Sequence, residues 1–213
     1  METSLGLFLL SAAVISLTGA MLPGPMTAAT IAKGYGNKNA GVPIAAGHAV
    51  VEIPVIVAIY FGFGHFISSP RVVDIIYIVG GLALFYLGFR MFRSGGDDPC
   101  EMAGLPSSSL VTGIVITGSN PGFYVWWVTI GMALITGAAE FGLIGLLLLI
   151  MVHWPLDLIW SEFVSRVTFK SRKWWTQKVQ KIIFTICAFI LVGFGVKFCL
   201  SAFSRVQGLQ GTF

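Results

Sequence analysis

Met21-Leu22-Pro23-Gly24-Pro25-Met26 lies inside a stretch without charged residues from Thr3 to Ala32, and Ser119-Asn120-Pro121-Gly122-Phe123 lies inside a second, from Met102 to Ala139. Each stretch exceeds the roughly 20 apolar residues with which a helix crosses a bilayer. Proline and glycine interrupt helical hydrogen bonding, and lipid offers the freed backbone groups no partner. The two stretches therefore predict broken membrane helices whose interruptions line a cavity between helices.

The composition is that of an integral membrane protein. Hydrophobic residues make up 56% of the 213 residues and charged residues only 10%, and the mean hydropathy is +0.87. A soluble domain carries about 25% charged residues. The apolar runs are continuous rather than alternating, which favours helices over a β-barrel. We expect an all-α polytopic membrane protein.

The apolar stretches, separated by charged or Gly/Pro-rich joints, predict six spans. Their approximate ranges are 4–32 (broken), 40–66, 72–92, 108–138 (broken), 141–164 and 178–202. The joint richest in Ser, Gly, Asp and Pro divides the chain into a first three-helix repeat (1–94), a cytoplasmic linker (95–107) and a second three-helix repeat (108–213).

The two halves resemble each other in four features that follow the same order. These are the breaks at Pro23 and Asn120, His48-x-x-x-Glu52 and His153-x-x-x-Asp157, Pro54 and Pro155, and Leu87-Gly88-Phe89-Arg90 and Phe194-Gly195-Val196-Lys197. Three spans per copy is an odd number, so the second copy enters the membrane upside down. The sequence thus predicts a 3+3 inverted repeat with broken helices 1 and 4, an arrangement that recurs in secondary transporters.

The distribution of cations predicts the orientation in the cytoplasmic membrane. Cytoplasmic loops of membrane proteins are enriched in Lys and Arg. With both termini outside, ten of the 13 cations fall on the cytoplasmic side and only Arg71, Lys197 and Arg205 fall outside. Because the cations border apolar spans, they indicate contact with lipid headgroups rather than with nucleic acid. We expect a multi-pass protein whose N- and C-termini are outside.

Two pairs of ionisable residues lie deep in predicted spans. His48 and Glu52 are four residues apart, as are His153 and Asp157, so each pair projects from one helix face. Charged groups in the bilayer are costly and usually mark an ion, proton or substrate pathway. We interpret the pairs as proton-coupling residues. Two alternatives stay open at this stage: a divalent-metal site made by the same four residues, and inert polar contacts between helices.

The breaks are the expected substrate site. An interrupted helix exposes a carbonyl end that attracts cations and an N–H end that attracts carboxylates, a combination suited to a zwitterion. We therefore predict substrate contacts from the residues of both breaks and from an aromatic residue that follows the second. These are Pro23, Gly24, Pro25, Asn120, Pro121, Gly122 and Tyr124. For the neighbouring Trp126 and Trp127, a pocket wall and an interfacial belt are equally good interpretations.

Several motifs resemble the lysine exporter (LysE/RhtB) family of small amino-acid exporters over nearly the whole chain. They are Leu22-Pro23-Gly24-Pro25 with the following Gly34 and Gly41, Tyr86-Leu87-Gly88-Phe89-Arg90, and Gly113 to Asn120-Pro121. The resemblance implies a cytoplasmic-membrane carrier that exports amino acids or related solutes using the proton gradient, without a prosthetic group. The sequence departs from the usual pattern at Met26 and Gly122. Its acidic second span resembles a subset of the family, and acidic motifs also occur in metal-transporting relatives of the wider superfamily.

We therefore predict a secondary transporter that exports amino acids or related zwitterionic or cationic solutes, by proton antiport. Its expected partners are the amino acid, protons and membrane lipids, and a homo-oligomer is left open. The first alternative is a divalent-metal transporter, and an alternative of another class is a membrane scaffold that transports nothing. No HExxH or GxSxG motif is present, so we do not expect an enzyme.

Overall fold

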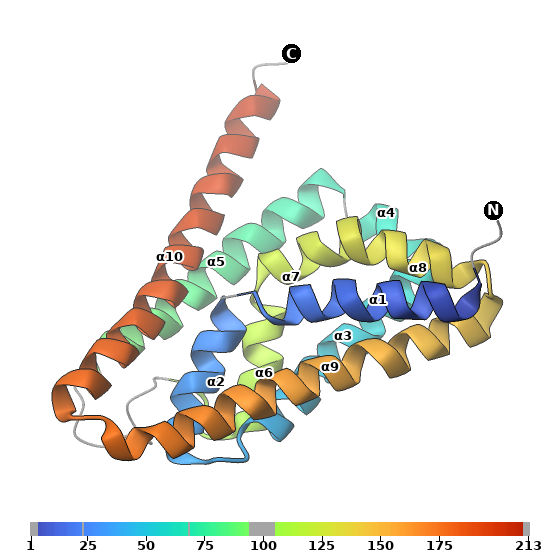
Figure 1. Ribbon diagram of the computed structural model, residues 1–213. Coiled ribbons are helices and arrows are strands. Elements are labelled where there is room, and N and C mark those ends of the chain that lie inside the picture. The colour runs from blue at the N-terminus through green and yellow to red at the C-terminus, as the bar shows by residue number, and fades with distance from the viewer. Residues whose placement is uncertain (1–3, 23, 68, 94–104, 211–213) are drawn as a thin grey trace.

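A computed structural model describes residues 4–22, 24–67, 69–93 and 105–210, and every regular element in these ranges is helical (Figure 1). The first half contains α1 (Leu5–Ala20), α2 (Pro25–Gly36), α3 (Gly41–Ala58), the π-helix η1 (Ile59–Phe63), α4 (Gly64–Ile67) and α5 (Pro70–Arg93). The second half contains α6 (Ser109–Gly118), α7 (Pro121–Trp126), the π-helix η2 (Trp127–Gly131), α8 (Met132–Ala139), α9 (Gly142–Ser171), the 3₁₀-helix η3 (Arg172–Trp174) and α10 (Gln177–Gln210).

The helices are long and apolar enough for a polytopic membrane protein, as predicted. Five candidate spans run over Gly41–Ile67, Pro70–Phe89, Pro121–Ala139, Gly142–Trp174 and Gln177–Arg205. A sixth span is formed when α1 and α2 are taken together as one broken helix. The fold class is therefore all-α with up to six spans in the described ranges.

The first break separates α1 from α2, which meet at an angle of 68°. Gly24 is the N-cap of α2 and has extended backbone angles, and Pro25 occupies the first helical turn, where a missing N–H costs nothing. The hydroxyl of Thr27 donates to the carbonyl of Leu22, at 3.2 Å, and so satisfies one acceptor at the end of α1. Pro23 lies outside the described residues.

The second break separates α6 from α7, and the side chain of a residue in the break caps α7. Asn120 is the N-cap of α7, and its Oδ1 accepts a hydrogen bond of 3.1 Å from the amide of Gly122. The Tyr124 hydroxyl donates to the carbonyl of Gly118, at 3.2 Å. Helix α6 is short, with 10 residues, while the part after the break qualifies as a span by itself. The predicted interruption of the 108–138 stretch is therefore present, near its first third.

Helix α9 extends beyond the predicted end of the fifth span, from residue 164 to Ser171. Ser165, the first residue beyond the predicted end, is buried against the α2–α3 connection. Ser165 is 0% exposed, and its hydroxyl lies 3.1 and 3.0 Å from the carbonyl oxygens of Asn37 and Lys38. Tertiary packing thus prolongs a helix whose composition indicated a boundary. Similarly, α10 begins at Gln177 and ends at Gln210, past the predicted residue 202.

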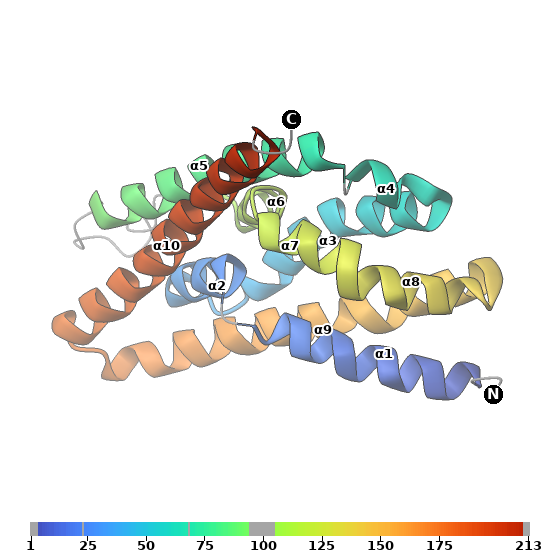
Figure 2. The ribbon, with the colours of Figure 1, turned by 90° about the horizontal axis from the view of Figure 1, so that it is seen from above.

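Equivalent spans of the two halves pack against each other. Helix α1 contacts α8 and α2 contacts α6, while α3 contacts α9 and α5 contacts α10. In Figure 1, α1 runs towards the centre of the molecule before the first break, whereas α7 and α8 run away from the centre after the second. Figure 2 shows α2 between α9 on one side and the crossing pair α5 and α10 on the other. The inverted repeat and the duplication stay predictions.

Glycine residues permit very close contact between helices α3 and α6. Helices α3 and α6 cross where Gly47 lies against Gly113. A Cβ atom on Gly47 would collide with the carbonyl oxygen of Leu110, and one on Gly113 would collide with that of Ile44. Such close backbone packing stabilises helix pairs in a bilayer, where the hydrophobic effect does not drive helices together. It also fixes the next residue, His48, on the interior side of α3.

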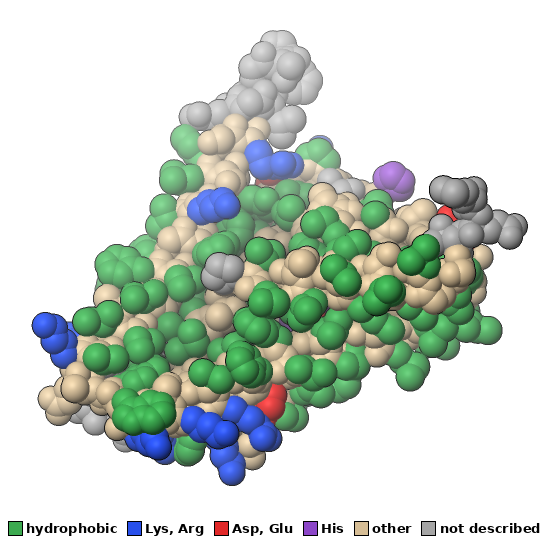
Figure 3. Space-filling view, viewed as in Figure 1, with side chains coloured by type: hydrophobic (Ala, Val, Ile, Leu, Met, Phe, Trp, Pro, Cys, Tyr) green, Lys and Arg blue, Asp and Glu red, His purple; other side chains and the backbone are tan. Residues whose placement is uncertain are grey.

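The surface carries large exposed apolar side chains along most helices, among them Leu10, Ile78, Leu147 and Phe189. Cations gather on the lower part of the face shown in Figure 3, over the α9–α10 connection, whereas the two termini lie on other sides of the molecule (Figure 1). At this end, Lys173 lies over the exposed ring of Trp174, with Nζ 4.6 Å from the ring centroid. The pairing of cations and indoles is typical of a membrane interface.

Candidate functional site

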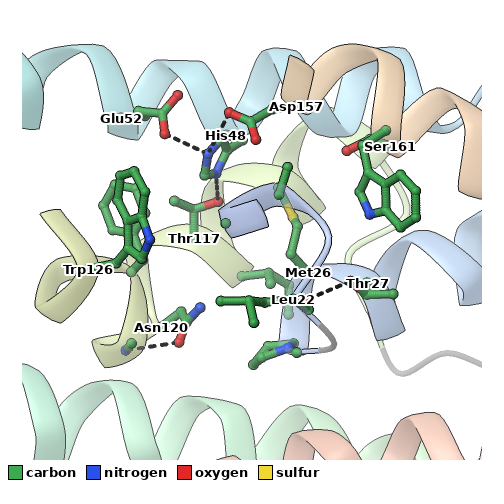
Figure 4. Close-up of a pocket in the computed structure, with 18 of the residues that line it drawn as sticks. Leu22, Met26, Thr27, His48, Glu52, Thr117, Asn120, Trp126, Asp157 and Ser161 are labelled. Atoms are coloured by element: carbon green, nitrogen blue, oxygen red, sulfur yellow. Dashed lines mark hydrogen bonds and ion pairs between the residues drawn. The ribbon is translucent and has the colours of Figure 1, made fainter. Parts of the chain in front are cut away.

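A cavity of about 310 Å³ lies where the two breaks meet α3 and α9. This volume is at the lower end of the range for small-molecule sites, roughly 300–1,000 Å³. Figure 4 shows the acidic residues of α3 and α9 on one side of it, with Leu22 and Met26 of the first break and Asn120 of the second on the other. Four helical segments that are distant in sequence therefore share one chamber.

Glu52 is the hub of a buried polar cluster. It is 1% exposed, and its Oε1 lies 2.9 Å from Nε2 of His48, 3.1 Å from Nε2 of His153 and 3.3 Å from Nε1 of Trp127. Because a carboxylate only accepts hydrogen bonds, these nitrogens are its donors. Its second oxygen, Oε2, is buried and has no hydrogen-bond partner. Oε1 thus accepts three hydrogen bonds, whereas no group in the described residues donates to Oε2.

Asp157 completes the cluster from α9. Its Oδ2 lies 3.3 Å from Nε2 of His153 and 3.8 Å from Nε2 of His48, which is close enough for ion pairing when a ring is protonated. Neither contact is aligned as a hydrogen bond, so this oxygen is also buried without a partner. The structure therefore brings together all four predicted ionisable residues from two helices, with both imidazoles facing both acids.

Each imidazole is held on its other nitrogen by a hydroxyl from a broken helix of the opposite half. Nδ1 of His48 lies 2.9 Å from Oγ1 of Thr117, on α6. Nδ1 of His153 lies 2.7 Å from Oγ of Ser16, on α1. A hydroxyl both donates and accepts, so it satisfies either protonation state of the ring. The mirrored pairs link the half-helix before each break to the acidic cluster.

The predicted break residues divide into those that line the cavity and those that do not. Gly24, Pro25, Asn120 and Gly122 line it. The substrate-contact role assigned to these residues stays a prediction.

Pro121 and Tyr124 are not among the lining residues. Pro121 is buried, and its ring packs against Gly80 of α5. Tyr124 is occupied at the break by its hydrogen bond to Gly118. Both lie where they support the break, and the predicted contact between Tyr124 and a substrate has no counterpart in the lining.

Aromatic residues form much of the remaining wall. Trp126, Trp127 and Trp160 line the cavity, together with Phe123 and Phe194. For Trp127, 1% exposed and bonded to Glu52, the pocket interpretation is therefore the one that fits its position, rather than the interfacial belt. Nε1 of Trp160 is buried without a hydrogen-bond partner.

The sequence did not predict a site role for Ser16, Thr117, Met26 or Ser161, although Met26 is a departure from the family pattern. Ser16 and Thr117 carry a usable signal, since each is a polar residue in the apolar stretch that precedes a break. Mid-helix Ser and Thr usually bond to their own backbone, however, and sequence cannot distinguish the two uses. Met26 and Ser161 carry no such signal, because apolar and small residues are abundant in packed membrane helices.

The cluster also has the donor set of a metal site. One ligand atom from each of His48, Glu52 and Asp157 lies within 4.8 Å of the others. Nitrogen and oxygen ligands of this kind suit several divalent ions without selecting one. His153, the fourth predicted ligand, is not in this group, although its Nε2 is 3.1 Å from Glu52. The residues thus fit a transiently bound divalent cation as well as a proton.

Comparison with known proteins identifies the family. The sequence profile of the LysE type translocator family matches residues 17–202, which span both breaks and the whole acidic cluster. No curated protein and no solved structure gives a significant match. Since the profile covers most of the chain, the protein belongs to the LysE type translocator family, whose members are membrane transporters of amino acids or related solutes rather than enzymes.

Proposed function

We propose that this protein exports amino acids or related small zwitterionic solutes across the cytoplasmic membrane by proton antiport. The proposal depends on one observation: two buried carboxylates, Glu52 and Asp157, each keep an oxygen without a partner beside a cavity that both broken helices line. Binding sites at the midplane, formed by interrupted helices, are typical of secondary transporters. Glu52 and Asp157 supply the protonatable groups that a proton-coupled site also needs.

Competition for these oxygens provides the coupling. An ammonium group and a proton both require a free carboxylate oxygen, so the binding of one lowers the affinity for the other. Linkage makes this effect reciprocal. When the cluster is exposed to the proton-rich side, protonation releases the solute, and when it is exposed to the cytoplasm, the solute displaces the proton. Mutual exclusion at one site is the physical requirement for antiport.

The hydroxyl contacts connect this competition to movement of the broken helices. Ser16 precedes the first break on α1, and Thr117 precedes the second on α6. Each hydroxyl is bonded to an imidazole that faces Glu52. A tilt of either half-helix changes the hydrogen bond between its hydroxyl and the imidazole, and this change alters the hydrogen bond between that imidazole and Glu52. The inverted 3+3 repeat, which we retain as part of the proposal, would make the two tilts equivalent and so allow alternating access.

The proposed orientation follows from the distribution of Lys and Arg. We propose that Lys170, near the end of α9, and Arg172 and Lys173 of η3 face the cytoplasm, with both termini outside, because cytoplasmic loops are enriched in cations. Arg172 is tied to the carbonyl of Tyr35 by a hydrogen bond of 2.5 Å and lies over Phe169, with Cζ 3.6 Å from the ring centroid. Cysteine labelling of the termini in intact cells tests this orientation; labelling only after lysis would reverse it.

Reconstitution tests the function directly. Proteoliposomes loaded with an amino-acid mixture and given an inward proton gradient are expected to release amino acids, with proton uptake followed by a pH-sensitive dye. Glu52→Gln and Asp157→Asn should each weaken the dependence on the gradient. Glu162→Gln is the matched control, because Glu162 lies on α9 but binds Arg166 and the amide of Val42 outside the cavity. Unchanged coupling in both cavity variants would overturn the proposal.

A divalent-metal carrier is the second candidate, supported by the convergence of His48, Glu52 and Asp157. It predicts that divalent ions bind the purified protein in calorimetry and cross the liposome membrane, and that His48→Ala removes both effects. Amino-acid release without metal flux excludes this candidate. Metal flux without amino-acid release favours it over amino-acid export. If neither solute crosses, a non-transporting scaffold becomes the better interpretation.

A further inference from the structure

We infer that the solute is an amino acid with a large, apolar and uncharged side chain, bound with its ammonium group at Glu52 and Asp157 and its carboxylate at the start of α2. This inference rests on the proposed function and specifies the substrate class of that site. Three observations support it: the ionisable residues that line the cavity, the hydrogen bonds that these residues already make, and the apolar side chains that line the rest of the cavity.

The charges in the cavity are few and concentrated. Among the described lining residues, the ionisable ones are Glu52, Asp157, His48 and His153, and neither Lys nor Arg is present. All four belong to the single cluster, so the rest of the chamber offers no second charged partner. A solute charge outside the reach of this cluster would be desolvated without compensation, at a cost of several kcal/mol.

The cluster accommodates one cationic group. Oε2 of Glu52 and Oδ2 of Asp157 both lack hydrogen-bond donors, and an ammonium group has three donors. Oε1 of Glu52 is already engaged by two imidazoles and an indole. The ring of Trp126 also lines the cavity and lies 5.7 Å, centroid to centroid, from that of His153. The α-ammonium of an amino acid would supply the donors that these two oxygens lack.

The carboxylate of the solute then requires an N–H-rich surface, and the two breaks differ in offering one. At the second break, Oδ1 of Asn120 already accepts the amide of Gly122. At the first, the N-cap is Gly24, which has no side chain, and α2 has no side-chain cap. Gly24, Pro25, Met26 and Thr27 line the same cavity as the unpartnered oxygen of Glu52. The open N-terminus of α2 is thus the better site for an anion, since helix N-termini favour negative charge.

The remaining space is apolar and aromatic. Leu22, Met26 and Ile116 line it towards the breaks. Trp160, Val164 and Phe194 line it towards α9 and α10. An apolar side chain of the solute gains from burial here, at roughly 25 cal/mol per Å². A lysine side chain would bring a second cation although both acids already bind the α-ammonium, and a glutamate side chain would bring an anion with no Lys or Arg to pair with, so both are disfavoured.

The test is an exchange assay on the wild-type protein, in which proteoliposomes loaded with one amino acid take up the same labelled amino acid. We expect kcat/KM for leucine, phenylalanine and tryptophan to exceed that for lysine and glutamate by about tenfold or more, as for a charge left unpaired in a buried site. Equal or faster exchange of lysine, abolished by Glu52→Gln, overturns the assigned class but leaves the proposed function intact. Absence of exchange for every amino acid overturns both.

A pair of variants tests the aromatic wall separately. Trp160→Ala should lower kcat/KM for phenylalanine relative to alanine by about tenfold, because it removes apolar surface only from the side-chain region. Trp174→Ala is the matched control, since Trp174 is 72% exposed near the same end of α9. The ratio of two substrates is insensitive to partial loss of folded protein. An unchanged ratio in Trp160→Ala would place the solute side chain elsewhere and overturn the assignment.

Discussion

The His48–Glu52 turn of α3 and the His153–Asp157 turn of α9 have the same spacing but opposite burial. On α3 the acid is the more buried partner, with side-chain exposures of 2% for Glu52 and 14% for His48. On α9 the histidine is the more buried partner, at 5% for His153 and 13% for Asp157. Similar sequence has therefore produced two different sites: a fixed inner acid and a more accessible outer one.

The difference follows from the neighbours of each turn. Helix α3 is pressed against α6 at Gly47, which places Glu52 against Trp127. Helix α9 has Val152 in the position that corresponds to Gly47 and is not held in the same way. We interpret Asp157 as the acid that meets the solute and proton first, and Glu52 as the acid that holds the cluster together. Four predictions test this difference between the two turns, in order of decreasing expected effect.

The largest effect is expected at the two acids. Glu52→Gln should lower proton-coupled exchange by roughly 100-fold, or about 3 kcal/mol, because three donors then face an amide. Asp157→Asn should lower it by only about tenfold, since its Oδ2 makes no hydrogen bond. Initial rates in proteoliposomes, normalised to folded protein, measure both. A larger loss in Asp157→Asn would reverse the assigned roles.

The next effect is on stability. Gly47→Val gives α3 the residue that precedes His153 in α9, and it should lower the free energy of unfolding by about 1–3 kcal/mol through overpacking against α6. Thermal unfolding in detergent measures the change. Val152→Ala, which changes only a half-buried position of α9, is the matched control and should have a smaller effect. A wild-type melting temperature in Gly47→Val would contradict the close crossing at Gly113.

A smaller effect is expected at the hydroxyls that hold the imidazoles. Ser16→Ala and Thr117→Val should each weaken coupling by about 1 kcal/mol, or roughly fivefold, through loss of one hydrogen bond. The pH profile of exchange is the diagnostic measurement, because a merely structural defect lowers the rate without moving the profile. Ser16→Thr and Thr117→Ser should restore function. Ser204→Ala on α10, whose hydroxyl bonds only to its own helix, is the control.

The smallest effect is expected at Trp127, whose indole donates its hydrogen bond to the α3 acid and whose ring packs against His153. Trp127→Phe keeps an aromatic ring but removes one of three donors to Glu52, so exchange should fall by a factor of about 2–5. Trp174→Phe, at an exposed position, should leave the rate unchanged. A loss as large as that of Glu52→Gln would show that the indole, rather than the imidazoles, dominates the hold on the acid.

Much of this architecture could be predicted from sequence, since it depends on local properties. Uncharged stretches longer than a bilayer indicate spans, and Pro25 and Pro121 cannot continue a preceding helix, so the breaks follow. The four-residue spacing of each His/acid pair fixes a shared helix face. The end of α9 could not be predicted, because the hydroxyl of Ser165 is stabilised by carbonyl groups of Asn37 and Lys38, which are distant in sequence.

Membrane embedding, the helical class, the two interruptions and the two ionisable pairs could all be predicted from the chain alone, because hydropathy and helical periodicity are properties of contiguous residues. The packing of the helices was needed to show that both imidazoles meet Glu52, and that Ser16 and Thr117 support them from positions 137 and 69 residues away. The physical reason is that such contacts depend on which helices pack together and at what rotation. The reversed burial of Glu52 and Asp157 arises at that level alone.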